Sequence, residues 1–94
     1  MRLLTLKNMI LKSGKKTIAH TNTAEVLGTN VPLASICVQA KLNNSNSIFI
    51  GGQDDQKIEL EAGDSIELDI VDNLNKIYVK GTAGEGVNYI YETN

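Results

Sequence analysis

The stretch SIELDI, residues 65–70, has the cleanest period-two alternation in the chain. Its three aliphatic side chains share one face of an extended segment, whereas its serine and two acids share the other. Successive side chains of a β-strand point to opposite faces of the sheet, so this pattern is typical of a half-buried strand. The residues predicted to face the core are Ile66, Leu68 and Ile70.

The same alternation recurs on both sides of this stretch. In SICVQAKL, residues 35–42, the aliphatic positions 36, 38, 40 and 42 share one face, and Ile58 and Leu60 are expected to point inward in the segment 57–61. Polar or glycine-rich runs separate the segments at the short spacing of a sandwich or barrel. We therefore predict an all-β fold, a small antiparallel β-sandwich or barrel of about seven to eight strands. Further strands are expected at 17–20, 24–27, 47–50, 77–80 and 87–91, with Gly51 and Gly52 ending the strand at 47–50. In the segment 87–91, Ile90 is on the opposite face from Val87, Tyr89 and Tyr91, so we expect both faces of this strand to be covered by sheet or by a partner.

The length of 94 residues sets a limit of one domain. We divide the chain into a basic N-terminal arm or first strand, residues 1–16, and a single β domain, residues 17–94. The apolar run at 3–11, LLTLKNMIL, is compatible with a strand, an arm or a short helix. A chain this short buries a small share of its unfolded surface, so we expect stability to be gained by self-association.

The charges are unevenly distributed, although the net charge is only −2. Residues 54–72 are rich in acids and have Lys57 as their only base, whereas the first twenty residues hold bases and no acid. Both regions are interpreted either as solvated faces or as surfaces by which one copy docks electrostatically on another surface. Nucleic acid is not expected as a partner, because the body is acidic and lacks stacking platforms. The basic residues of the arm are Arg2, Lys7, Lys12, Lys15 and Lys16.

Few residues in the chain suit catalysis or metal binding. His20 is the only histidine and Cys37 the only cysteine, so an intrachain disulfide and a multi-cysteine metal site are both excluded. We expect Cys37 to be a buried, inert thiol on the opposite strand face from Ile36 and Val38. The sequence predicts no enzyme activity, catalytic residue, metal or cofactor. It also predicts neither a signal peptide nor a transmembrane segment.

One long stretch of the sequence resembles a known family. GDSIELDIVDNLNKIYVKGTAGEGVNYIY, residues 63–91, is similar to a module recurrent in small tailed-bacteriophage virion proteins of the capsid decoration or head-fibre type. Residues 23–40 and 47–52 follow the order of that module, and LNKIYVKGTAGEGVNYIY is its most specific part. The sequence departs from it in a shorter loop at 53–56 and in Ala62, where a proline is common. The arm lies outside the resemblance.

The resemblance implies a non-enzymatic structural protein of the virion. We expect a capsid decoration, or cement, protein that is made in the host cytoplasm and binds the outer capsid surface to stabilise the shell. Its partner would be the major capsid protein of the same virion, and it would be a homo-oligomer on the particle, with neither nucleic acid nor membrane bound. The basic arm is expected to become ordered on the particle.

Two alternatives remain at this point. One is a β module on a virion surface that binds a glycan or receptor through loop residues beside an aromatic platform. Tyr78, next to the loops at 43–46 and 53–56, would be that platform. The other is a tail or neck component with the same fold. The Asp54–Asp55 pair has the chemistry for calcium but lacks the ligand spacing of an EF-hand loop, so a bare turn is predicted there. The candidate loop contacts are Asn43, Asn44, Asn46, Asp54, Asp55 and Tyr78.

Overall fold

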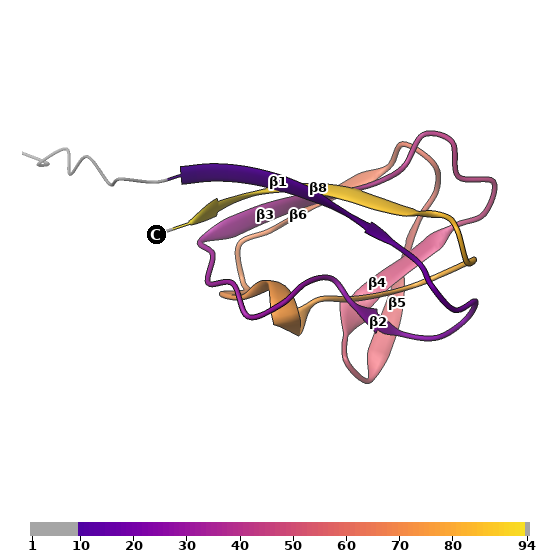
Figure 1. Cartoon of the computed structure of the whole chain (residues 1–94), viewed down its shortest axis with the longest axis horizontal. Coiled ribbons are helices and arrows are strands. Elements are labelled where there is room, and N and C mark those ends of the chain that lie inside the picture. Colours follow the sequence, from indigo (N-terminus) through magenta and orange to yellow (C-terminus); the bar gives the residue numbers. More distant parts are fainter. Residues whose placement is uncertain (1–9, 94) are drawn as a thin grey trace, which may run out of the picture.

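The computed structural model describes residues 10–93, which form two antiparallel sheets in two layers (Figure 1). Each sheet has four strands. A single turn of 3-10 helix, η1 (Leu74–Lys76), lies between the sixth and seventh strands. The prediction of a small, all-β antiparallel sandwich is confirmed. The strands are β1 (Ile10–Thr17), β2 (Glu25–Val26), β3 (Ser35–Ala40), β4 (Ile48–Gly52), β5 (Asp55–Leu60), β6 (Ser65–Leu68), β7 (Tyr78–Lys80) and β8 (Gly86–Thr93).

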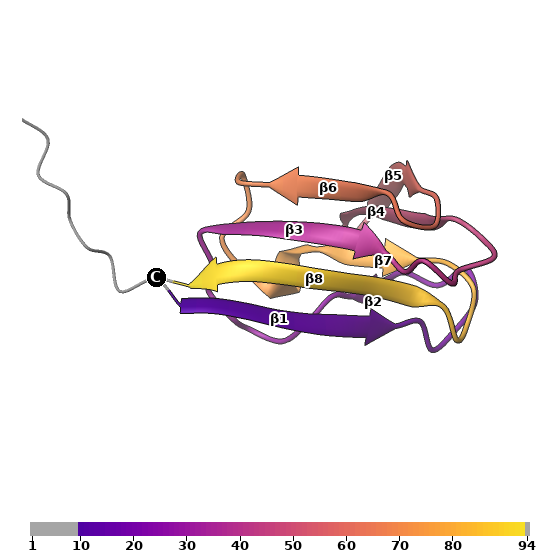
Figure 2. The same cartoon turned by 90° about the horizontal axis from the view of Figure 1, so that it is seen from above.

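Sheet A has the strand order β1-β8-β3-β6, as Figure 2 shows from above. The last strand of the chain, β8, lies inside this sheet. It pairs with β1 along its whole length and with β3 from Val87 to Glu92. The short strand β6 pairs with β3 alone and forms one edge of the sheet, and β1 forms the other.

Sheet B has the strand order β2-β7-β4-β5 and covers the other side of the core. Strands β4 and β5 form a hairpin with its turn at residues 53–54 and a register shift between Ile50 and Gly52. Strand β2 contributes only two residues, which pair with β7. Gly51 and Gly52, expected to end the strand at 47–50, belong to β4.

The core between the sheets is aliphatic apart from one tyrosine. It follows the predicted alternation most closely in β3, where positions 36, 38 and 40 are buried and positions 35, 37 and 39 are half-buried. Burial of these side chains supplies the main driving force for folding. The buried residues are Ile18, Leu27, Leu33, Ile36, Val38, Ala40, Ile48, Ile50, Leu60, Leu74, Ile77, Val79, Val87 and Tyr91.

Three aliphatic residues predicted to face the core are exposed. Leu42 lies beyond the end of β3 and is 79% exposed, and Ile70 lies beyond the end of β6 and is 87% exposed. Ile58 is inside β5 but is 52% exposed, because β5 is an edge strand. The burial expected for these three side chains was wrong, although Ile58 is on the predicted face of its strand. Alternation fixes the face of a residue but not whether another layer covers it.

Residues 10–16, assigned to the arm or first strand, belong to β1 and pair with β8. The boundary expected between residues 16 and 17 therefore falls inside a strand. Only residues 1–9 of the predicted arm lie outside the described residues. A further strand expected at 17–20 does not form, because β1 ends at Thr17 and the buried Ile18 begins the connection to β2.

Gly86, the first residue of β8, is buried where β8 and β1 meet. A Cβ at this position would overlap the backbone carbonyl of Lys16 on β1. Neither partner has a flexible side chain that could move aside, because the obstacle is backbone within a paired ladder. Position 86 therefore needs glycine for steric reasons.

We predict that Gly86→Ala lowers the free energy of unfolding by about 2 kcal/mol, the usual cost of overpacking. Urea denaturation followed by circular dichroism measures it. Gly52→Ala is the matched control, because nothing lies within 4 Å of a Cβ there, and it should change stability by less than about 0.5 kcal/mol. Equal effects of the two substitutions would contradict the steric argument.

Glu25 on β2 ties sheet B to the end of β1. Its carboxylate accepts hydrogen bonds from the backbone N–H groups of Ala19 and His20, at 2.9 and 2.7 Å, and pairs with Lys16 Nζ at 3.1 Å. Burial acts to raise the pKa of Glu25, but these donors together hold the pKa below its ordinary value of 4.5. The charged carboxylate therefore stabilises the folded state.

We predict that Glu25→Gln lowers the free energy of unfolding at pH 7 by about 2 kcal/mol, because charged acceptors make the stronger hydrogen bonds. The folded-state pKa is the lower one, so this contribution is present above the unfolded-state pKa and is lost as the pH falls through the folded-state pKa. The difference from the unmodified chain should accordingly shrink below about pH 4.5. Denaturation between pH 3 and 8 tests it, with the exposed Glu61→Gln as control.

Candidate binding surface

The solvent side of sheet A, here called the outer face, carries a regular array of side chains. The register places Leu11, Glu92 and Ser35 in one row across β1, β8 and β3, and Ser13, Ile90 and Cys37 in the next. The alternate side chains of these strands point into the core, so the outer face is the side that sheet B leaves uncovered. Its members are Leu11, Ser13, Lys15, Ser35, Cys37, Gln39, Ser65, Glu67, Asp69, Asn88, Ile90 and Glu92.

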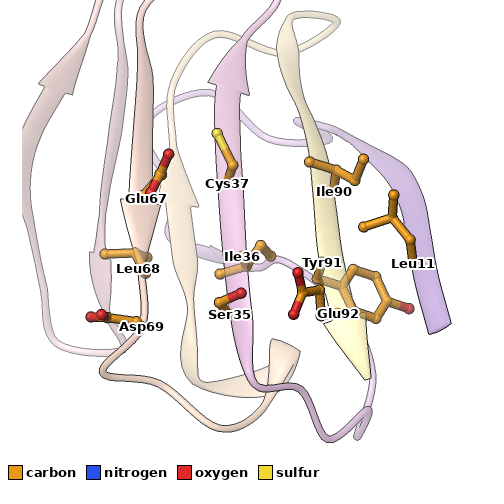
Figure 3. Close-up of a pocket in the computed structure, with 10 residues that line it drawn as sticks. All are labelled: Leu11, Ser35, Ile36, Cys37, Glu67, Leu68, Asp69, Ile90, Tyr91 and Glu92. Carbon is orange, nitrogen blue, oxygen red and sulfur yellow. The ribbon is translucent and has the colours of Figure 1, made fainter. Parts of the chain in front are cut away.

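A shallow groove of about 420 Å³ crosses the outer face. Figure 3 shows its lining residues on all four strands of sheet A, with Leu11 on β1, Ile90 on β8 and Glu67 on β6. A second hollow of about 310 Å³ adjoins it and shares Cys37 and Ile90. Both are open to solvent, whereas small-molecule sites usually enclose most of their ligand. This geometry suits a protein surface better than a small molecule.

The outer face combines exposed aliphatic side chains with acidic ones. Ile90 is 43% exposed and Leu11 is 63% exposed, and Glu67, Asp69 and Glu92 line the same groove. Exposed aliphatic side chains rimmed by charges are typical of protein interaction sites. A partner with basic groups around an apolar patch would complement it.

Cys37 and Ile90 are more exposed on the outer face than the sequence predicted. Cys37 is on the opposite strand face from Ile36 and Val38, as predicted, but it is half-buried in the groove and not enclosed in the core. Ile90 was expected to be covered by sheet or by a partner, and no described strand covers it. Its apolar side chain at an outward-facing position was the sequence signal for this surface.

The predicted arm residues do not form one cluster. Lys15 is exposed and pairs in register with Asn88, which places it on the outer face. Lys16 is on the opposite side of β1 and is engaged by Glu25, and Lys12 is exposed beside Tyr91. Arg2 and Lys7 lie outside the described residues.

The asparagine loop after β3 is held against the start of β8. Asn44 donates from Nδ2 to the Gly86 carbonyl at 2.8 Å and accepts from the Gly86 N–H at 3.2 Å. The backbone N–H of Asn46 donates to Glu85, whereas Asn43 is exposed. Asn44 thus has an internal structural role, and its amide is occupied by the backbone.

Tyr78 and the two aspartates lie at the other end of β4 from this loop. Tyr78 pairs with Gly51, and Asp54 and Asp55 form the exposed end of the β4–β5 hairpin. Strand β4 separates them from the asparagine loop by about 13 Å at 3.3 Å per residue. The expectation that Tyr78 lies next to both loops was therefore wrong, because it is beside the hairpin alone.

We predict that Asn44→Ala lowers the free energy of unfolding by about 1–2 kcal/mol, because the Gly86 N–H loses the amide oxygen that accepts from it and the Gly86 carbonyl keeps only the Lys41 N–H as donor. Urea denaturation measures this loss. Asn43→Ala is the matched control in the same loop and should leave stability unchanged within about 0.5 kcal/mol. If Asn44→Ala proved neutral, the loop would not depend on this contact.

His20 and Cys37, the side chains considered for catalysis, lie in different parts of the fold. His20 is exposed in the connection between β1 and β2, whereas Cys37 is on the outer face. Within residues 10–93, no group of three or more histidine, cysteine or acidic side chains is placed to hold a metal ion. The same part of the chain has no helix that is long and apolar enough to span a membrane.

Comparison with protein-family models, curated proteins and solved structures found no match to this chain.

Proposed function

We propose that this protein is a structural component of a tailed-bacteriophage virion, a decoration protein that binds the outer surface of the capsid and stabilises the shell. The observation that carries the proposal is the outer face of sheet A, a broad and shallow surface with exposed Ile90 on the inner strand β8 and exposed Leu11 on the edge strand β1. The resemblance of residues 63–91 to small virion proteins suggests that the partner is the major capsid protein. A sheet face of this type stabilises a shell by adding buried interface at many symmetry-related positions.

The charges on the outer face define what the capsid surface should offer. Glu67, Asp69 and Glu92 line the groove, and Lys15 lies toward the other end of the face. The major capsid protein would therefore contribute bases around an apolar patch. Contacts between charges at the rim of an interface mainly affect the rate of association and its salt dependence, whereas the apolar centre supplies most of the affinity.

The structure does not favour the glycan alternative, because the tyrosine and the loop asparagines expected to form one sugar site are far apart. Tyr78 and the asparagine loop are at opposite ends of β4, and Asn44 is occupied by the backbone of Gly86. A tail or neck component would use the same outer face on a different partner, so binding to isolated capsids distinguishes it.

We expect the chain to co-sediment with capsids assembled from the major capsid protein of the same virus. Ile90→Asp should weaken this binding at least about tenfold, equivalent to 1.4 kcal/mol, because it places a charge among the exposed aliphatic side chains of the outer face. The side chain of Ile90 is outside the core, so circular dichroism should be unchanged. Quantified sedimentation over a range of protein concentrations gives the dissociation constants.

Leu42→Asp is the matched control, since Leu42 is equally aliphatic, more exposed and outside the outer face. It should bind as the unmodified chain does. A chain that stays in the supernatant at both low and physiological salt would refute the capsid role. Deletion of residues 1–16 is unsuitable as a test of the arm, because it removes most of β1 from sheet A.

A further inference from the structure

The side of the sandwich bounded by β5 and β6 is open, and an apolar groove of about 230 Å³ runs along it. We call it the side groove. It is separate from the groove on the outer face, sharing only Leu68 with it. The side groove is lined by Ile50, Gly51, Gly52, Ile58, Ile66, Leu68, Ile70, Val71, Lys76 and Ile77.

The side groove exists because sheet A leaves part of the core face of β5 uncovered. Ile58 on β5 pairs in register with the buried Ile50, so both side chains are on the core face of sheet B. Ile50 is 2% exposed, whereas Ile58 is 52% exposed. Sheet A has no strand beyond β6 among residues 10–93. At the end of β5 Leu60 is buried in the core, whereas Ile58, two residues earlier on the same face, is left largely uncovered.

Both strands at the side groove have a free edge. Among residues 10–93, β6 pairs only with β3, and β5 pairs only with β4. A free edge presents unpaired backbone N–H and C=O groups, which makes it a template for another extended segment. A strand added to β6 would extend sheet A over Ile58 and would place its own inward side chains in the side groove.

We propose that the side groove binds residues 3–9 of a second copy of this chain, added as an extended strand along the free edge of β6. The sequence of this segment, LLTLKNM, is rich in leucine and contains no acid. In an extended segment Leu4 and Leu6 share one face and Lys7 lies on the other. With the leucines in the groove, Lys7 is on the side of Glu67 and Asp69, which supplies charge complementarity.

Two other occupants are less suited to the side groove. If two grooves met through their β6 edges, Glu67 and Asp69 of one copy would approach the same acids of the other, and like charges side by side are unfavourable. The chain's own segment begins at β1, on the opposite edge of sheet A (Figure 2). Crossing three strand spacings takes about 14 Å, or at least four residues, and so uses Leu6 and Lys7 before β6 is reached.

Exchange of this segment links the β1 side of one copy to the β6 side of the next. Such a head-to-tail contact forms a ring if the rotation closes and a filament if it does not. This inference stands independently of the capsid proposal, because it concerns contacts between copies in solution. Its apolar contacts are in the side groove, and it shares with the outer face only Leu68, Glu67 and Asp69.

The first test compares the full chain with a variant that lacks residues 2–9, using size-exclusion chromatography with light scattering. The full chain should form an oligomer, and the deletion variant should have the mass of a monomer with an unchanged circular dichroism spectrum. Ile70→Asp should also yield monomers, and its fold should persist because Ile70 is 87% exposed. Leu42→Asp, 79% exposed and outside the groove, should leave the oligomer intact.

The second test adds a peptide of residues 1–10 to the deletion variant and measures binding by isothermal titration calorimetry. Ile70→Asp in the deletion variant should raise the dissociation constant at least about tenfold. Lys7→Glu in the peptide should weaken binding, and Glu67→Lys in the deletion variant should restore it. A full chain that is monomeric up to about 100 μM, or an oligomer unaffected by both the deletion and Ile70→Asp, would overturn the proposal.

Discussion

The pairing of β8 with both β1 and β3 is the constraint on which the rest of this structure depends. The last strand of the chain lies between the first and the third, so sheet A cannot form until residues from both ends of the chain have met. Gly86 and Asn44 secure the start of β8, one by its lack of a side chain and the other by its amide. Because these contacts are distant in sequence, folding must pay the entropy of closing long loops.

Most of the fold could be predicted from alternation alone. The face of each residue in β3 follows directly from the sequence, because this strand is central and both its faces have a defined environment. Ile58 and Ile70 show the limit of the method: their faces follow the pattern, but their exposure depends on whether the opposite sheet extends over them. Sheet order, which decides this, has no signature in a single strand.

The candidate surface could be predicted only in part, because it combines strands that are far apart in sequence. Ile90 was visible as an aliphatic residue at an outward-facing position, but its neighbours on the outer face follow from the register of β8 with β1 and β3. Asn44 and Tyr78 appeared in the sequence as loop and platform residues for a common site. Strand β4 separates them, and the backbone of Gly86 occupies the asparagine. Local sequence carries no information on these distances.

The two sides of the sandwich, where the edges of sheets A and B lie near each other, differ in the residues that face the gap between the sheets. This difference connects the fold with the proposed contacts between copies. On the β1 and β2 side, Glu25 reaches across to Lys16 and to two backbone N–H groups, which closes the gap between the sheets. On the β5 and β6 side the facing residues are aliphatic, and no ion pair among the described residues spans them. On the first side, the Glu25 carboxylate finds all these partners within the same chain. On the second side, Ile58 and Ile70 are exposed, and burying them would require another segment to cover them. The β1 and β2 side is thus closed within one chain, and the β5 and β6 side is where we propose that a segment of another copy docks.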